Sequence, residues 1–312
     1  MKANVKYAGI LILLSLVWGS SFILMKRGMI DKETGDLIFT SNQVGSMRML
    51  FASTALLPMG LRSLKIITSY KIGISLAVVS LAGSFIPAFL FTYAETGISS
   101  GYAGMLNSTT PIFTLLIGAL FFRQKMLQMQ VIGVLIGTIG IIALVNGVST
   151  VDTSGTYLHV IAIVFATICY ALSTNTMRYN LSHLQPLKVT SVAFVFAFLP
   201  AVFLFFYFET PATIVENPHA NKALVYISIL ALVGTALSLI LFNYLISKTS
   251  ALFASSVTYL IPIVAVIIGL IDGETLSWIQ IFAMIIILLG VYIANRMKNK
   301  KEKKPKIYGI NK

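Results

Sequence analysis

The chain has 312 residues, of which 57% are hydrophobic and 11% are charged. The charged share is less than half of that in soluble domains, and one soluble core of this size could not bury so much apolar surface. The formal net charge of +13 could suggest nucleic-acid binding, but many of the basic residues crowd a C-terminal tail directly after an apolar stretch. Such a run is typical of an anchor near anionic lipid head groups, so the composition indicates an integral membrane protein.

The first apolar stretch, from Tyr7 to Met25, is predicted to be a retained helix. The residues before it resemble the start of a signal peptide. The stretch is too long for the apolar part of a typical signal peptide, however, and it ends on Lys26 and Arg27 without a small-residue cleavage site.

Ten segments reach the length of about 20 mostly apolar residues that a membrane-spanning helix needs. They are 7–26, 40–61, 72–94, 99–122, 129–147, 157–178, 187–208, 223–247, 251–271 and 277–296. The connections between them are short, and none could form a separate soluble domain. The predicted fold is an all-α integral membrane protein with ten transmembrane helices.

Lysine and arginine in the connections predict the orientation. With a cytoplasmic N-terminus, the external connections hold only Lys26, Arg27, Lys32 and Lys222. Nearly all other basic residues then face the cytoplasm. Both termini are therefore expected to be cytoplasmic, and the compact architecture favours a bacterial inner membrane.

An internal repeat relates the two halves of the chain. At a shift of 151 residues, 82–118 aligns with 233–269 without a gap and matches glycine, proline and tyrosine positions. Five helices per copy is an odd number, so the second copy enters the membrane from the other side, as in the inverted repeats of many secondary transporters. The predicted domains are 1–147 and 148–297, each a five-helix repeat, followed by a basic cytoplasmic tail at 298–312.

The fourth and ninth predicted helices carry the most informative pattern. Gly104, Asn107, Pro111 and Gly118 share one helical face. Their repeat partners are Ser255, Thr258, Pro262 and Gly269. A proline within a polar span frees a backbone carbonyl, and a broken helix at mid-membrane is a usual feature of a binding site. Close packing of helices through small residues is the alternative, and it is favoured for the two glycines.

Aromatic pairs repeat as well. Trp18 and Tyr170 lie one turn from Ser21 and Ser173, and Tyr93 is matched by Tyr244. Tyr102 and Tyr259 lie near the same helices. Aromatic rings can stack on a solute in a cavity, or they can simply pack in the core.

Arg48 is the only basic residue well inside a predicted span. An arginine there faces a partner or a wet cavity, where it could meet a substrate carboxylate, but a structural role as a cap for carbonyls is favoured. Glu95 and Glu274 lie at helix ends, so proton coupling through a buried carboxylate is not evident. Glu274 is expected to cap the start of the tenth helix, and Lys26 and Arg178 are expected to be solvated.

Catalytic and metal motifs are weak. The run from Gly97 to Gly101 matches a nucleophile pattern around Ser99, but that pattern requires a strand before the serine. Ser99 and its repeat partner Ser250 are better explained as helix N-caps. The single cysteine, Cys169, fits a packing role, and the three histidines show no metal spacing. No catalytic residue, metal site or cofactor is predicted.

These residues resemble the EamA-type drug/metabolite transporter superfamily over nearly the full length. The likeness lies in the run from Trp18 to Phe22 with Lys26, in Arg48, and in Gly273 with Glu274. The stretches Ser99–Pro111 and Ser250–Pro262 also resemble the family's pattern. The first half departs from it, with Arg123, Gln124 and Lys125 where a Gly-Glu pair is typical.

The resemblance implies a carrier of small metabolites or drugs with a cavity between the two halves. We expect an exporter of an amino-acid-like or similar polar solute that works by alternating access. Its expected partners are the lipid bilayer, the solute, and a coupling ion or an exchanged solute. It is expected to be a monomer or a weak homo-oligomer. A gated channel and a Ser99 hydrolase are the alternatives. The candidate substrate-binding residues are Trp18, Ser21, Arg48, Tyr93, Asn107, Pro111, Tyr170, Tyr244, Thr258, Tyr259 and Pro262.

Overall fold

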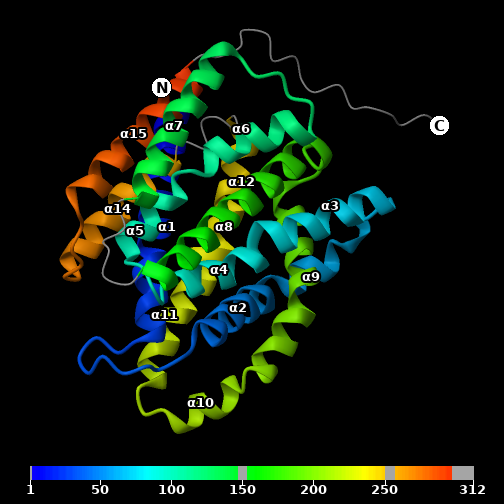
Figure 1. The fold of residues 1–312 in the computed structure, drawn as a ribbon. Helices are drawn as coiled ribbons and strands as arrows, with labels where there is room; N and C mark the ends of the chain where they lie inside the picture. The colour runs from blue at the N-terminus through cyan, green and yellow to red at the C-terminus, as the bar shows by residue number, and fades with distance from the viewer. Residues whose placement is uncertain (1, 147–152, 250–256, 297–312) are drawn as a thin grey trace.

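The computed structural model describes residues 2–146, 153–249 and 257–296, and these form a bundle of helices (Figure 1). The first half contains α1 (Lys2–Met29), α2 (Ser41–Arg62), η1 (Leu64–Ile66), α3 (Tyr70–Ser80), η2 (Leu81–Phe85), α4 (Ile86–Ala94), α5 (Ser100–Asn107), α6 (Thr110–Phe121) and α7 (Gln128–Asn146). The second half contains α8 (Thr153–Asn180), α9 (Pro186–Tyr207), α10 (Thr210–Glu216), α11 (Ala220–Ala231), η3 (Leu232–Leu237), α12 (Ser238–Lys248), α14 (Val257–Ile271) and α15 (Trp278–Arg296).

Eight helical stretches among the described residues are long and apolar enough to cross a membrane. Two further apolar helices, Val257–Ile271 and Trp278–Ala294, are shorter. The all-helical membrane architecture is therefore confirmed, while the number of ten spans stays a prediction. The first six residues of the predicted segment 251–271 lie outside the described part of the chain.

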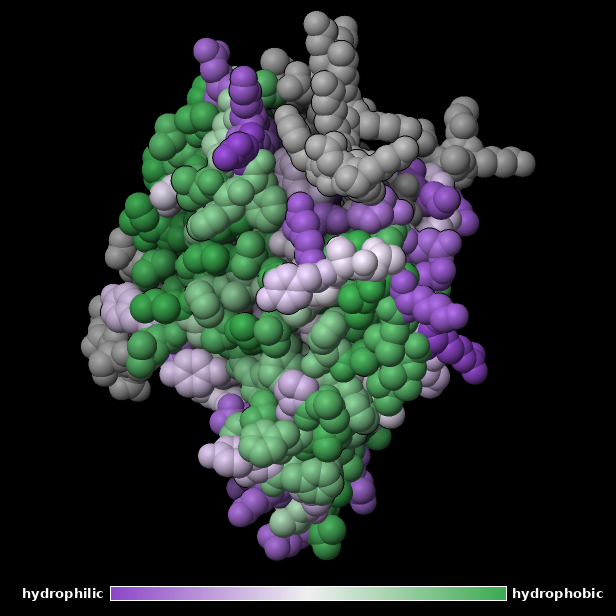
Figure 2. Space-filling view, turned by 90° about the vertical axis from the view of Figure 1, so that its right-hand side faces the viewer, coloured by the Kyte–Doolittle hydropathy of each residue, from purple (hydrophilic) through white to green (hydrophobic). Residues whose placement is uncertain are grey.

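The outer surface suits a lipid environment. Figure 2 shows a broad hydrophobic area over the middle of one face, with hydrophilic side chains gathered toward the upper, right-hand and lower edges. Large apolar side chains such as Leu120, Leu199 and Phe203 are more than 60% exposed. In water this surface would be costly, whereas lipid tails solvate it.

Polar side chains define where several helices begin. Thr40 and Gln43 form a capping box at the start of α2, in which each side chain accepts from the other's backbone amide. The Ser99 hydroxyl accepts from the Tyr102 amide at 3.3 Å, which confirms Ser99 as the N-cap of α5. Its predicted counterpart, Ser250, lies outside the described residues.

The fourth predicted helix is broken where the sequence indicates. α5 ends at Asn107 and α6 begins at Thr110, with Pro111 in its first turn. Proline has no amide hydrogen and cannot donate to the carbonyl one turn earlier. The Thr110 hydroxyl takes over this role, because it donates to the Asn107 carbonyl at 2.8 Å.

Each half also contains a wider π-helical segment inside one span. These segments are η2, between α3 and α4, and η3, between α11 and α12, and their first residues are 151 positions apart. The shift found in the sequence therefore relates backbone irregularities as well as residue types. Such π segments often mark functional sites, since they displace backbone carbonyls from the regular ladder.

Helices of the two halves pack in matching pairs. α2 packs on α9, and α7 packs on α15. In the same way α1 packs on α11 and α14, while α8 packs on the corresponding first-half helices α3 and α6. Two copies of one unit related by a pseudo-two-fold axis produce this pattern.

The contact between α7 and α15 is close because both helices present glycine. A Cβ atom added at Gly133 would lie 2.5 Å from the Gly290 carbonyl oxygen, and one added at Gly290 would lie 2.5 Å from the Gly137 amide nitrogen. Gly133, Gly137 and Gly140 thus serve close packing of helices, because a Cβ atom at each would meet neighbouring atoms at under 3 Å. The start of α1 and the end of α15 lie at the same, upper end of the bundle in Figure 1, opposite the loop that follows α1.

Candidate functional site

A cavity of about 180 Å³ lies between the two halves. Residues of α1, α2, α5 and α6 line it from the first half, and residues of α8, α9, α12 and α14 line it from the second. Both π segments reach it, through Gly83 and Ser84 in η2 and through Gly234 and Thr235 in η3. Its wall combines apolar and aromatic side chains with hydroxyl and amide groups and one arginine, which suits a small solute that is partly polar.

Six of the eleven candidate residues line this cavity: Trp18, Ser21, Arg48, Asn107, Tyr170 and Thr258. They come from five different helices, so the fold brings together side chains that are up to 240 positions apart.

The other five candidates are not in the cavity wall. Tyr93 stacks on His159 with ring centroids 4.7 Å apart, and the ring of Tyr244 lies under the Lys6 ammonium. The Tyr259 hydroxyl donates to the Val291 carbonyl at 2.8 Å and so ties α14 to α15. Pro111 and Pro262 are buried, in the first turn of α6 and inside α14.

Trp18 is held in place by the second π segment. Its indole Nε1 donates to the Gly234 carbonyl at 3.0 Å, across the interface between the halves. Its ring meets Phe242 edge to face at 5.1 Å, and Phe91 and Tyr170, which also line the cavity, stack at 5.9 Å. These contacts fix the aromatic walls before any solute enters.

Serine and glycine pair twice across the cavity wall. A Cβ atom at Gly83 would lie 2.4 Å from the Ser173 hydroxyl, and one at Gly234 would lie 3.0 Å from the Ser21 hydroxyl. Each pair joins the first helix of one half to the π segment of the other. The repeated Gly83 and Gly234 therefore serve close approach at the site.

Arg48 enters the cavity from α2 and is buried, with 9% of its surface exposed. Its Nε donates to the Thr235 hydroxyl at 2.9 Å, and its other described hydrogen bond goes to the Met25 sulfur at 3.6 Å. None of the described ion pairs includes Arg48. The described contacts of Arg48 are thus to side chains of α1 and η3, and its role in binding or in structure stays a prediction.

Several polar residues of the site were missed. Thr190, Thr235 and Asn243 line the cavity, and the Asn243 side-chain amide donates to the Thr190 hydroxyl at 2.6 Å. Thr235 is the repeat partner of Ser84, which also lines the cavity. The signal in the sequence for Ser84 and Thr235 is their position within apolar spans, next to the matched Gly83 and Gly234.

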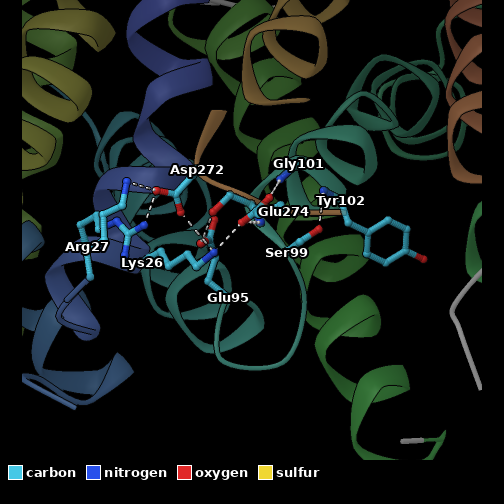
Figure 3. Close-up of polar contacts among 10 residues, drawn as sticks. Lys26, Arg27, Glu95, Ser99, Gly101, Tyr102, Asp272 and Glu274 are labelled. Carbon is cyan, nitrogen blue, oxygen red and sulfur yellow. Dashed lines mark hydrogen bonds and ion pairs between the residues drawn. The ribbon is translucent and has the colours of Figure 1, made fainter. Parts of the chain in front are cut away.

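A second polar feature lies between α1, the start of α5 and the turn after α14 (Figure 3). We call Lys26, Arg27, Asp272 and Glu274 the Lys26–Glu274 cluster. Lys26 Nζ lies 2.8 Å from Glu274 Oε1 and 3.5 Å from Asp272 Oδ2, and Arg27 pairs with Asp272. The expectation that Lys26 is merely solvated is wrong, because α1 carries it into contact with the turn after α14.

Glu274 also caps a helix, but not the one expected. Its carboxylate accepts from the backbone amides of Ser100 and Gly101, both at 2.9 Å, at the start of α5. The start of α15 is capped instead by Ser277 and Gln280. Burial raises the pKa of Glu274, but hydrogen bonds from Lys26 and the two amides outweigh it and hold this pKa below its usual value.

The hydrolase alternative finds no support around Ser99. Its hydroxyl is engaged as a helix cap in a turn between α4 and α5, where the nucleophile pattern requires a strand. Within the described residues, no group of three His, Cys, Asp or Glu side chains could hold a metal ion.

The comparisons with known proteins agree with this architecture. The model of the EamA-like transporter family matches residues 6–146 and 158–296. The uncharacterized inner membrane transporter YedA of Escherichia coli K12 is 26% identical over 294 residues, which cover 91% of each chain. A probable amino-acid metabolite efflux pump of Salmonella typhimurium is 23% identical over 299 residues, covering 90% of this chain and 92% of the pump.

A solved crystal structure shares the fold, with a TM-score of 0.59 and 13% identity, over 93% of this chain and 96% of the other. The resemblance inferred from the sequence is thus confirmed, with the family matched once in each half. The chain belongs to the EamA-like transporter family and is a multi-pass integral membrane transporter.

Proposed function

We propose that this transporter exports a small, carboxylate-bearing metabolite of amino-acid type by alternating access. The observation that carries the proposal is Arg48, a buried cation in the wall of a cavity between the halves, without a carboxylate partner among the described residues. A buried charge is normally paired, and a substrate carboxylate would complete the pair. Outward direction is supported by the efflux pump among the relatives.

The size of the cavity favours a small solute over a drug. About 180 Å³ is below the ~300–1,000 Å³ that is usual for pockets of drug-sized ligands. The amide groups of Asn107 and Asn243 offer acceptors for a substrate ammonium, and the rings of Trp18 and Tyr170 offer apolar surface. We therefore assign Trp18, Ser21, Arg48, Asn107, Tyr170 and Thr258 to the substrate site.

We further propose ten spans with both termini in the cytoplasm of a bacterial inner membrane, divided into repeats 1–147 and 148–297 with a basic tail. The positive-inside distribution supports this orientation. It places the Lys26–Glu274 cluster at the external end. This cluster joins the halves at that end, so exposure of the cavity to the outside requires it to separate.

The test is uptake by proteoliposomes that contain the full chain, with a panel of neutral amino acids, their methyl esters and the corresponding decarboxylated amines. We expect saturable uptake and trans-stimulation for at least one free amino acid, and no competition by its ester or amine. Uptake without saturation would indicate a channel. Equal competition by acid and ester would overturn the role of the carboxylate.

Arg48→Gln directly tests the proposed contact between Arg48 and the substrate carboxylate. Loss of a charge-assisted hydrogen bond is worth about 1.5–3 kcal/mol, which corresponds to a rise in KM of roughly 10- to 150-fold. Arg62→Gln is the matched control, because Arg62 ends the same helix and is exposed. An unchanged KM in Arg48→Gln would remove Arg48 from the substrate site.

A further inference from the structure

Glu95 lies next to the Lys26–Glu274 cluster and is buried. It follows the last residue of α4, and only 5% of its surface is exposed. Its Oε2 accepts from the Ser100 hydroxyl at 3.0 Å. Its Oε1 is buried and has no hydrogen-bond partner among the described residues. The sequence places this carboxyl at a helix end, where water would normally solvate it, but the fold excludes water from it.

The charges that face Glu95 do not neutralise it. Lys26, from α1, is engaged by Glu274 and Asp272, and Arg27 is engaged by Asp272. Glu274 faces Glu95 from the turn after α14 and adds negative charge. The two cations of the cluster are thus already engaged by its own two carboxylates. An ionised Glu95 would add a third anion, and none of the described ion pairs includes it.

The remaining neighbours of Glu95 are no better partners. Lys32 reaches Asp272 at 3.3 Å from the surface and is 60% exposed. His159, from α8, contacts the residues on either side: its ring stacks on Tyr93, and its Nε2 lies 3.1 Å from the Thr96 hydroxyl. The polar group that α5 presents is the Ser100 hydroxyl already described.

A buried carboxylate without a counter-ion is costly, and the group instead keeps its proton. Burial raises the pKa of Glu95 well above its ordinary value of 4.5, and Glu274 acts in the same direction. The hydrogen bond from Ser100 and the charge of Lys26 oppose this shift without cancelling it. In the closed arrangement of this end, Glu95 is therefore protonated under conditions where a hydrated glutamate is ionised.

We propose that Glu95 is a proton-binding site whose occupation stabilises the closed form of the end held by the Lys26–Glu274 cluster. The cluster joins α1 and α5 of the first half to the turn after α14 of the second. When the halves separate there, water reaches Glu95 and the proton leaves. Closure of this end then takes up one proton, and opening releases one. With the orientation proposed above, that proton is exchanged with the external medium.

The sign of the pH dependence follows from linkage. The closed form binds the proton more tightly than the open form, so acid favours closure, and the closed population falls as the pH rises through the raised pKa. One proton changes the ratio of closed to open by at most about tenfold per pH unit. Protonation of Glu274 has the opposite effect and favours the open form, because the pKa of Glu274 is lowered in the closed form. This effect appears only below its ordinary pKa of 4.5.

The experiment measures this conformational change without a substrate, so its outcome is independent of the transport assay. Spin labels are placed at Asp36→Cys in the first half and Thr275→Cys in the second, both exposed positions, in a Cys169→Ala background of the full chain in lipid nanodiscs. The distance between labels is then followed from about pH 5 to about pH 9, a range above the ordinary pKa of a glutamate.

We expect one short distance in acid and a growing longer component in alkali. Glu95→Gln, which imitates the protonated form, should keep the short distance throughout. Glu33→Gln is the matched control, since Glu33 is an external-loop acid that is 80% exposed, and it should respond like the wild type. The same pH response in Glu95→Gln as in the wild type would overturn the proposal.

Infrared difference spectroscopy on the wild-type protein gives a second measurement that needs no stable variant. We expect the C=O stretch of a protonated carboxylic acid to persist above the pH at which an ordinary glutamate ionises, and to disappear as the pH is raised further. Loss of the band at the ordinary pKa of a glutamate would overturn the assignment even if Glu95→Gln failed to fold.

Discussion

The turn after α6 in the first half and the turn after α14 in the second share a backbone hydrogen bond to a matched glycine carbonyl, although the first turn is one residue longer, and they differ in side-chain chemistry. The Gln124 amide donates to the Gly118 carbonyl at 3.0 Å, and the Glu274 amide donates to the Gly269 carbonyl at 2.8 Å. Arg123, which precedes Gln124, and Gly273, which precedes Glu274, both have a positive φ angle. In Figure 1 the two turns lie toward the upper end and the lower-left end of the bundle.

The side chains at these turns differ in charge. Glu274 forms an ion pair with Lys26, while Gln124 accepts a neutral hydrogen bond from the Tyr179 hydroxyl at 3.2 Å. The repeat therefore places a similar turn at both ends, but among the described contacts Glu274 makes an ion pair with the first helix of the other half, whereas Gln124 makes a neutral hydrogen bond. A transporter that alternates between two openings needs such a difference to set which one is favoured at rest.

The largest expected effect is at the close contact between α7 of the first half and α15 of the second. Gly290→Ala should place a methyl group against the backbone of α7, which cannot rotate away as a side chain can. Overpacking of this kind costs about 1–3 kcal/mol, and we expect the upper end of this range. Thermal unfolding in detergent measures it. Gly9→Ala is the control, because no atom lies within 4 Å of a Cβ there. Equal melting temperatures for the two variants would show that α7 and α15 are not packed this closely.

Glu274→Gln removes the difference between the two turns. The ion pair with Lys26 is lost, while the glutamine oxygen can still accept from the amides of α5. Removal of one partner from a fully buried pair costs about 3–5 kcal/mol, but Lys26 is 28% exposed, so we expect about 2 kcal/mol. The closed form at this end should then fall about 30-fold relative to the open form.

The spin-label pair described above measures this change, at neutral pH. Glu33→Gln is again the control, since its ion pair with Lys222 at 3.2 Å lies on the surface. A distance distribution that is the same in Glu274→Gln and in the wild type would mean that the ionic closure does not set the resting state.

Much of the fold could be predicted, because hydrophobic length and small-residue spacing are local signals. The broken helix at Asn107 follows from Pro111, and the 151-residue shift reaches both π segments through Gly83 and Gly234. The partners of charged side chains could not be predicted in this way. Glu274 reads locally as a cap for the next helix, whereas its actual partners, Lys26 and the amides of α5, lie in the other half.

The candidate site shows the same limit. Helical periodicity places Thr258 and Tyr259 near one another, but it does not say which of them meets the cavity and which meets α15. In the structure Thr258 lines the cavity, whereas the Tyr259 hydroxyl donates to the Val291 carbonyl. Polar cavity residues such as Thr235 were missed because a single threonine in an apolar span usually bonds its own helix.

The smallest expected effect concerns the backbone of the two turns. Arg123 has a φ angle of 53°, in the left-handed region where a side chain is strained, and Gly273 occupies the corresponding position at 90°. Arg123→Gly should relieve this strain and raise stability by about 0.5–1 kcal/mol, because Arg123 is exposed and little packing is lost.

The reciprocal change, Gly273→Ala, provides the matched test. No atom lies within 4 Å of a Cβ at Gly273, so any destabilisation there comes from the backbone alone. We expect a loss of about 1 kcal/mol in Gly273→Ala and a gain in Arg123→Gly, both measured by thermal unfolding in the same detergent. If both variants were destabilised, the two turns would not be equivalent in energy. The positive φ angle would then not be a common element on which the ion pair of Glu274 and the neutral hydrogen bond of Gln124 both depend.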